Sequence, residues 1–381
     1  MDTAILAFAS SATLGALLLL TSRFHDRYSA DPVGRSAQKV HAVPVPRIGG
    51  LAIYFGFAAG AVSLWGDAHT LSLALALLAL PAFFGGLVED LNKHISTVAR
   101  LLWTFAAAGF AFFALDARIT DLSLPGTDLL LGMAFASLLF TMFAVAGCSH
   151  SLNIVDGLNG LAGITALAIL TAIAFVARAV GDDPIAVAAL VAAGSVAGFL
   201  VWNFPRGALF LGDGGSYLVG FVVAELAVLL VHRNTEVSPW FALTVLAYPV
   251  CETVFSMYRR RMLLRRSAMD PDGLHLHTLV YKRLTRHNGR GSANENAAAT
   301  VYLVMLGAMV MVPAVYFWNN TLALQAVALT FVGLYLVCYR TLVRMRVPWW
   351  LSLRGLSRRA EMSKIASADR DAISLGKRKP K

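Results

Sequence analysis

The segment "GDGGS", residues 212–216, places one carboxylate, Asp213, among three glycines. Asp-Gly is a common turn dipeptide, so a simple turn is one interpretation of the segment. The alternative is the start of a helix, where free backbone N–H groups bind anions and a neighbouring acid can hold a cation. On this second interpretation Asp213 is a magnesium ligand and Gly214 lies against a substrate phosphate, with Mn²⁺ as the alternative ion.

Two adjacent acids, Glu89 and Asp90, follow an apolar run in "GGLVEDLNKHIS", residues 85–96. Acids at the end of a membrane helix usually reach for water, so a solvated helix end is the simplest interpretation. Neighbouring carboxylates repel each other, however, and a bound cation relieves that repulsion. Both acids are therefore candidates for a functional site.

Asn153 and Asp156 are three residues apart in "SHSLNIVDGLNGLAG", residues 149–163. On a helix this spacing places both side chains on one face. The glycines that follow allow another chain or a ligand to approach closely. A helix-breaking turn is the alternative, but an amide and a carboxylate that face one cavity would suit a ribose, a base, an amide ligand or a metal.

Arg47 precedes a glycine pair in "HAVPVPRIGG", residues 41–50. One interpretation is an arginine that fixes membrane orientation next to a proline-stiffened turn. The other is an arginine that binds a phosphate beside exposed backbone donors. We predict the phosphate-binding role.

His275 and His277 lie in the longest polar loop, shortly after Asp270 and Asp272. Zinc uses such residue types, but a His-x-His pair with nearby acids is not by itself a tetrahedral site, and we do not predict zinc. The arginines of "YRRRMLLRRS", residues 258–267, would hold a polyanionic substrate at this face of the membrane. The two histidines are therefore candidates for contacts with substrate phosphates.

All of these polar segments lie between long apolar runs. Of the 381 residues, 57% are hydrophobic and 14% are charged, whereas about 25% of an ordinary soluble domain is charged. The sequence predicts an all-α, polytopic integral membrane bundle of about eleven transmembrane helices. The expected helices lie near residues 1–22, 48–65, 70–88, 98–115, 127–148, 160–178, 185–202, 215–232, 240–257, 298–317 and 321–339.

The basic residues are unevenly distributed over the loops. All but three of the 32 Lys and Arg residues fall in one of the two alternating sets of loops, the exceptions being Arg118, Arg178 and Arg233. Because basic loops stay in the cytoplasm, we expect a periplasmic N-terminus, one catalytic domain over residues 1–339 and a basic cytoplasmic tail over residues 340–381. This asymmetry explains most of the net charge of +10, so no nucleic-acid partner is expected.

In combination, the motifs resemble those of a known family. "VPRIGG", an acidic pair after a helix, "NIVDGLNGLAG", "FLGDGGS" and "HLH" occur in this order and on one side of the membrane in the polyprenyl-phosphate N-acetylhexosamine-1-phosphate transferases. The resemblance spans residues 40–285 and implies that the matching side chains line an active site. We assign catalytic roles to Asp90, Glu89, Asp156 and His277, substrate-binding roles to Arg47, Asn153, His275 and Gly214, and the metal to Asp213.

The resemblance also implies an activity. The enzyme would lie in the bacterial inner membrane with its active site facing the cytoplasm, and would transfer a sugar 1-phosphate from a UDP-N-acetylhexosamine to undecaprenyl phosphate. The products would be UMP and a lipid-linked sugar diphosphate that initiates a cell-envelope glycan, with O-antigen and capsule among the alternatives. The sugar and the oligomeric state are left open, a homodimer being one alternative for the latter.

The chemistry of this reaction agrees with the residues found. Two phosphate-bearing substrates repel each other, so attack on the β-phosphorus needs positive charge, which Mg²⁺, Arg47 and the histidines can supply. A phosphate monoester has a second pKa of about 6 and is mostly a dianion at neutral pH. We therefore expect Asp90 to position or activate the lipid phosphate rather than to act as an obligatory base.

Two positions depart from the family pattern. Glu89 stands where the family usually has the first of two aspartates, and Thr278 stands in the last place of the usual His-x-His-His. The peptidoglycan branch, the phospho-N-acetylmuramoyl-pentapeptide transferases, typically has three consecutive histidines here and is the main alternative. A secondary transporter is a more distant one, because such proteins commonly show internal repeats and midplane sites, whereas the motifs here lie at one face.

Overall fold

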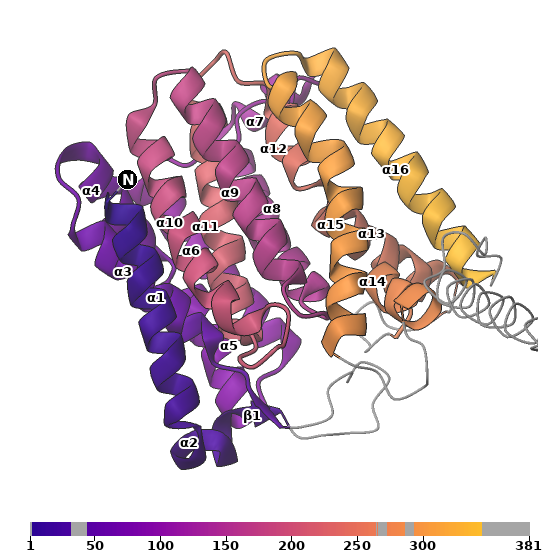
Figure 1. Cartoon of the computed structure of the whole chain (residues 1–381). Helices are drawn as coiled ribbons and strands as arrows, with labels where there is room; N and C mark the ends of the chain where they lie inside the picture. Colours follow the sequence, from indigo (N-terminus) through magenta and orange to yellow (C-terminus); the bar gives the residue numbers. More distant parts are fainter. Residues whose placement is uncertain (1, 32–43, 264, 266–272, 286–292, 345–381) are drawn as a thin grey trace, which may run out of the picture.

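The computed structural model describes residues 2–31, 44–263, 265, 273–285 and 293–344, so the predicted tail is described only to residue 344. Over these residues the chain is an all-α bundle of long helices, as the apolar runs predict (Figure 1). Nine of the described segments are long and apolar enough to cross a membrane. They are α1 (Asp2–Leu20), the joined pair α4 (Gly66–Leu78) and α5 (Leu80–Asn92), α6 (Thr97–Ala114), α8 (Ala134–Val155), α9 (Leu161–Ala179), α10 (Asp183–Asn203), α11 (Gly212–Arg233), α15 (Ala293–Tyr316) and α16 (Thr321–Val343).

Three of the eleven expected spans have unusual shapes. The second expected run forms α3 (Gly49–Val62), which has only 14 residues. The ninth is broken into α12 (Pro239–Val245) and α13 (Ala247–Tyr258), whose directions differ by 72°. If this bent pair is one span, the described residues contain up to ten spans. The fifth, expected over 127–148, is divided between α7 (Thr127–Leu131) and α8, which continues to Val155 through residues expected to form a loop. Each expected run is thus largely helical, and the orientation in the membrane stays a prediction.

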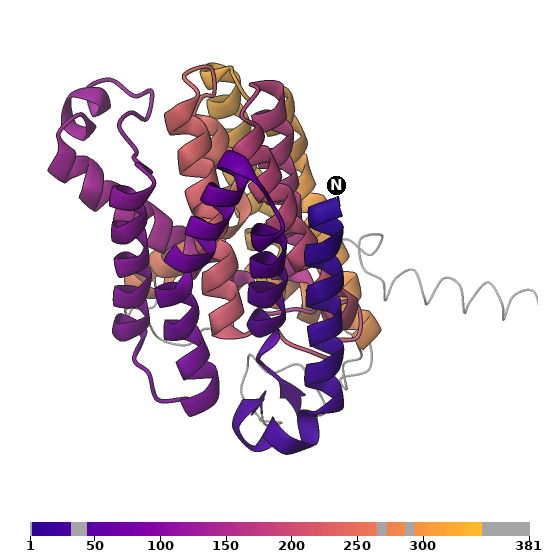
Figure 2. The same ribbon diagram turned by 90° about the vertical axis from the view of Figure 1, so that its left-hand side faces the viewer.

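The short elements gather mainly at one end of the bundle. In Figure 2, α1 runs down the side of the molecule to α2 and a small β-pair at its lower end. The two strands are antiparallel, with Ala30 opposite Pro46. The short elements are α2 (Ser22–Ser29), β1 (Ala30–Asp31), β2 (Val45–Pro46), α7 (Thr127–Leu131), η1 (Arg259–Leu263), α14 (Leu276–Val280) and η2 (Tyr281–Thr285).

Helix α11 forms the centre of the bundle. Every residue from Gly212 to Leu230 is buried, whereas α16 and α1 bury few of their side chains. Glycines let neighbouring backbones reach α11, as small residues do in membrane helix packing. A Cβ atom on Gly50 of α3 would lie 2.6 Å from the Cα of Gly215, so α3 crosses α11 backbone to backbone.

The outer helices present apolar side chains to the surroundings. Met309 and Val312 of α15 are 65% and 68% exposed, and Leu322 and Leu329 of α16 are 77% and 70% exposed. A continuous apolar surface of this kind is unfavourable in water and is typical of helices that face lipid hydrocarbon.

Candidate active site

Asp213 is the meeting point of four helices. Its Oδ1 accepts hydrogen bonds from Arg47 Nη2 and Asn153 Nδ2, both at 3.0 Å, and its Oδ2 forms an ion pair with Arg100. Asp213 is only 6% exposed. Two guanidinium groups and an amide therefore surround a buried carboxylate at the first turn of α11, which supports the helix-start interpretation of "GDGGS" over a simple turn.

Asp90, from α5, holds the start of α11 in place. Its carboxylate accepts the N–H of Asp213 at 3.0 Å and the N–H of Gly214 at 2.9 Å. A carboxylate at a helix N-terminus is favoured both by these orphan donors and by the helix dipole. The amide of Gly214, which we expected to face a substrate phosphate, is thus engaged by Asp90 here, and a role for Gly214 in substrate binding stays a prediction.

Glycine is required where these chains meet. Gly212 has φ of +76°, and a Cβ atom there would lie 2.6 Å from Oδ2 of Asp90. The left-handed conformation and the lack of space both exclude larger residues. The glycine pattern around Asp213 therefore serves to bring Asp90 to the amides of α11.

Asn153, in the last turn of α8, and Asp156, which follows the helix, both reach α11, although only Asn153 lies on the helix that their spacing predicts. The helix ends at Val155, and Asp156 follows directly, with its Oδ2 3.5 Å from the Ser216 hydroxyl. Burial, with a smaller contribution from the nearby Asp213, raises the pKa of Asp156 to about 7 against the opposing effects of Arg47 and Ser216. Asp156 therefore titrates near neutral pH. Its neighbour Asp213 is a carboxylate with more hydrogen-bond and ion-pair partners.

The acidic pair of α5 divides between two environments. Asp90 is buried and faces α11, whereas Glu89 is half-buried and accepts the N–H of Ile95 at 2.7 Å. Adjacent residues on a helix point about 100° apart, so the two acids cannot share all of their neighbours. Glu89 lies close enough to Arg100 to interact with it electrostatically. Among the described contacts, Glu89 makes none with Asp213, whereas Asp90 does.

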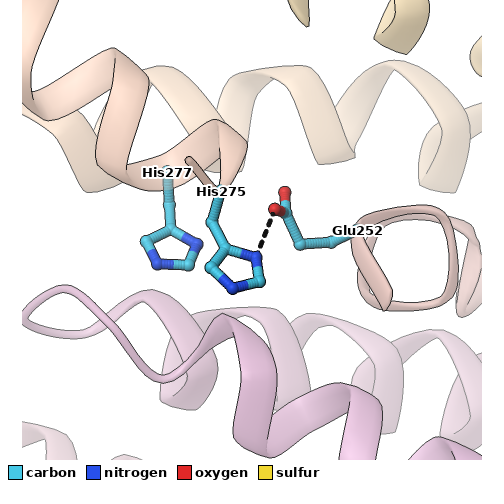
Figure 3. A group of neighbouring side chains, drawn as sticks. All are labelled: Glu252, His275 and His277. Carbon is cyan, nitrogen blue, oxygen red and sulfur yellow. Dashed lines mark hydrogen bonds and ion pairs between the residues drawn. The ribbon is translucent and has the colours of Figure 1, made fainter. Parts of the chain in front are cut away.

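The two histidines lie at the start of α14, near the turn that follows Asp156. His275 caps α14 and His277 lies in it; both are buried, with nearly parallel rings whose centres are 5.2 Å apart (Figure 3). A Cβ atom on Gly157 would lie 2.7 Å from Cδ2 of His277, so the histidine segment packs on the turn that follows Asp156. The structure thus brings His277 to the turn that follows Asp156, and contacts of the two histidines with substrate phosphates stay a prediction.

Glu252 of α13 joins the histidines in a buried group. Its Oε1 accepts hydrogen bonds from His275 Nδ1 at 3.0 Å and from the N–H of Leu276 at 2.9 Å, and its Oε2 accepts the Tyr335 hydroxyl at 3.1 Å. One ligand atom from each of Glu252, His275 and His277 lies within 4.8 Å of the others, a set that could hold a metal. The three hydrogen bonds already account for the position of the carboxylate without an ion.

Of the four residues considered as zinc ligands, Asp270 and Asp272 lie outside the described residues, so the structure tests only the two histidines.

Two residues of the site, Arg100 and Glu252, were not predicted from the sequence. Arg100 lies in the first turn of α6, where it was counted only as a basic residue that sets orientation. Glu252 lies inside an apolar run, and a charged side chain within a membrane segment is costly and is itself a sign of function. That cost was the signal for Glu252, whereas nothing in the spacing links Arg100 to Asp213, 113 positions away.

The fold and the site together define a polytopic membrane protein with clustered acids, arginines and histidines at one end of its helices. The sequence matches glycosyl transferase family 4 over residues 72–231, a region that contains Asp90, Asn153, Asp156 and Asp213.

Individual relatives extend this match. The chain is 30% identical over 326 residues to the decaprenyl-phosphate N-acetylglucosaminephosphotransferase of Mycobacterium leprae, covering 71% of this chain and 79% of the relative. It is 28% identical over 243 residues to the probable undecaprenyl-phosphate N-acetylglucosaminyl 1-phosphate transferase of Bacillus subtilis, covering 64% and 67%. It is 30% identical over 243 residues to the phospho-N-acetylmuramoyl-pentapeptide-transferase of Bacillus cytotoxicus, covering 60% and 74%. The chain belongs to glycosyl transferase family 4.

Proposed function

We propose that this protein transfers an N-acetylhexosamine 1-phosphate from a UDP-sugar to a polyprenyl phosphate, with release of UMP. The observation that carries the proposal is the arrangement of Arg47, Arg100, Asn153 and two carboxylates around the start of α11. Such a cluster of opposite charges at the end of membrane helices suits a reaction between two phosphates, one of which is anchored in lipid. The names of the family members support the same reaction.

In the proposed reaction, an oxygen of the lipid phosphate bonds to the β-phosphorus of the UDP-sugar, and the bond from that phosphorus to the UMP oxygen breaks. Arg47, whose side chain is one-third exposed, is placed to contact the incoming phosphates. Arg100 and Asn153 keep the Asp213 carboxylate oriented. Asp90 fixes the start of α11, which makes it a positioning residue for Asp213 in addition to its predicted role with the acceptor.

The donor atoms at this site suit magnesium. Mg²⁺ takes oxygen ligands, and one or two carboxylates with substrate phosphates complete its shell. Asp213 and Asp156 would hold it, because Asp90 already accepts two backbone amides. Asp213 would then exchange a guanidinium contact for the ion, which would supply positive charge to the reacting phosphates.

The donor sugar is proposed to be UDP-N-acetylglucosamine or a close relative. The match to the N-acetylglucosaminephosphotransferase covers 71% of this chain, whereas the match to the pentapeptide transferase covers 60%. "HLHT" also lacks the third histidine expected of the peptidoglycan branch. We further propose that the site faces the cytoplasm of a bacterial cell, where UDP-sugars are made, and that the product begins an envelope glycan.

The test is a UMP-release assay with purified protein in detergent, undecaprenyl phosphate and Mg²⁺ or Mn²⁺. The donor panel contains UDP-N-acetylglucosamine, UDP-N-acetylgalactosamine and UDP-N-acetylmuramoyl-pentapeptide. Release of UMP that depends on both lipid and an N-acetylhexosamine donor is expected. Release only with the pentapeptide donor would assign the chain to the peptidoglycan branch, and no release with any donor would contradict the proposal.

A further inference from the structure

We propose that Glu252 is a positioning residue for the histidine segment, residues 274–277, and that it holds His275 in one orientation and one tautomer toward the substrates. The inference rests on the proposed function in one respect, namely that the two histidines act in the transfer reaction. Its structural part stands on contacts that α13, the first residue of η1 and α16 make with the start of α14 and the residues just before it.

The first observation is the number of donors on one carboxylate. Glu252 is fully buried, and it accepts hydrogen bonds from a side chain, a backbone amide and a tyrosine hydroxyl. The side chain and the amide belong to consecutive residues, His275 and Leu276. One carboxylate therefore fixes both the ring of His275 and the path of the backbone that carries it, and charge-assisted bonds of this kind are the strong ones.

A second buried group, the guanidinium of Arg259, holds the same segment. Nη1 of Arg259 donates to the carbonyl of Leu274 at 2.9 Å and to the hydroxyl of Tyr339 at 2.7 Å. Arg259 is only 4% exposed. The residues before and after His275 are thus both bound to charged side chains of the bent span, and each of these charges is bound in turn to a tyrosine of α16.

These contacts determine which nitrogen of His275 carries a proton. Because Glu252 can only accept at Oε1 while it is ionised, Nδ1 of His275 must donate. The other ring nitrogen, Nε2, points away from Glu252 (Figure 3). A carboxylate bound to one nitrogen of an imidazole fixes the tautomer and the orientation of the ring, and here it leaves Nε2 facing away from Glu252. This geometry suits a contact between His275 and a substrate phosphate.

The arrangement gives α16 a role that its position does not suggest. This last described helix lies at the right of the bundle in Figure 1, away from α5. Its Tyr335 and Tyr339 nevertheless complete the two charged contacts that hold the histidine segment.

The test compares Glu252→Gln with a matched control, Glu225→Gln. Glu225 of α11 is also fully buried, and neither of its carboxylate oxygens has a hydrogen-bond partner in the described part of the chain. Both variants replace a buried carboxyl by an amide of the same shape, so a general effect of the exchange appears in both. Only Glu252→Gln removes the charge that faces His275.

The first readout does not depend on activity. Carbethoxylation of His275 and His277 by diethyl pyrocarbonate, followed by peptide mass spectrometry, reports how accessible and how reactive the two rings are. We expect at least a fivefold faster modification of His275 in Glu252→Gln, a smaller acceleration in Tyr335→Phe and the parental rate in Glu225→Gln. Equal rates in all four proteins would overturn the positioning role.

The second readout is kinetic. Glu252→Gln should lower kcat/KM for UMP release at least tenfold while Glu225→Gln keeps the parental value, and it should have no further effect when His275 is already alanine. A full tenfold loss from Glu252→Gln in the His275→Ala background would show that Glu252 acts through the fold in general. If the parent protein releases no UMP, the proposed function fails, and the modification rates alone decide the positioning role.

Discussion

Replacement of Gly86 by alanine tests the contact between α5 and α11 on which the site depends. A Cβ atom on Gly86 would lie 2.6 Å from the carbonyl oxygen of Asp213, which is about 0.8 Å inside the 3.4 Å of an ordinary contact. The atom it meets belongs to the backbone and cannot rotate away. The two helices must therefore separate, and Asp90, four residues further along α5, must move with its helix.

Two opposing effects set the size of the change. Overpacking of a filled core costs about 1–3 kcal/mol, whereas alanine is more favourable than glycine inside a helix by about 1 kcal/mol. We expect a net loss of up to about 2 kcal/mol in stability from these two terms. Separation also lengthens the two bonds from Asp90 to the α11 amides, now 3.0 and 2.9 Å. Activity should fall at least tenfold, which corresponds to about 1.4 kcal/mol of transition-state stabilisation.

The measurement is thermal unfolding in one detergent, followed by tryptophan fluorescence, together with UMP release. Gly147→Ala in α8 is the matched control, because nothing lies within 4 Å of a Cβ atom at that position. The control should unfold at the parental temperature or slightly above it. If Gly86→Ala unfolds with the control and keeps its activity, α5 and α11 do not meet backbone to backbone and Asp90 does not hold the start of α11.

Three further predictions concern charge and orientation. Asp213→Asn should lower UMP release at least a hundredfold, about 2.7 kcal/mol, and excess Mg²⁺ should rescue it poorly; more than half of the parental rate at limiting Mg²⁺ would remove Asp213 from the metal site. Because the pKa of Asp156 is raised from 3.8 to about 7, the folded chain holds an extra proton between these two pH values, so the free energy of unfolding should fall as the pH rises from 4 to 7. Asp156→Asn should remove this part of the pH dependence. Plots of stability against pH that run parallel for the parent and the variant would contradict the shift. A cysteine that replaces Glu236, in a loop at the end of the bundle opposite the site, should react with a membrane-impermeant thiol reagent on intact cells. A cysteine that replaces His94, in the loop next to the site, should not react. The reverse result would invert the proposed orientation.

The polar residues at helix ends could be predicted from the sequence because membrane topology constrains them. Segments that follow alternate spans lie on one side of the membrane, so Asp90, Asn153 and Asp213 were expected near each other before their contacts were known. The structure confirms that these three residues meet. The helical character of the apolar runs was predictable for a related reason, since backbone groups in hydrocarbon must be satisfied within the segment.

The pairing of individual charges could not be predicted in this way. Arg100 and Glu89 lie in the same loop region as the site, and only the direction in which each side chain points assigns Arg100 to Asp213 and Glu89 to Ile95. The bend between α12 and α13 likewise follows from no single residue in the apolar run. It turns α13, which carries Glu252, by 72°, and only the structure brings that acid to the histidines.

The glycines around Asp213 illustrate how one sequence pattern can have a different cause from the one first assigned to it. Glycine beside a helix start suggests space for a phosphate, and this was our expectation for Gly214. In the structure, Gly86 and Gly212 remove side chains at the points where α5 and the Asp90 carboxylate meet the start of α11. The anion that occupies the first amides of this helix is therefore a side chain of the protein. We therefore expect a substrate phosphate to bind mainly through Arg47, the histidines or a metal ion, and for this reason the arginine and histidine variants test substrate binding more directly than further glycine variants.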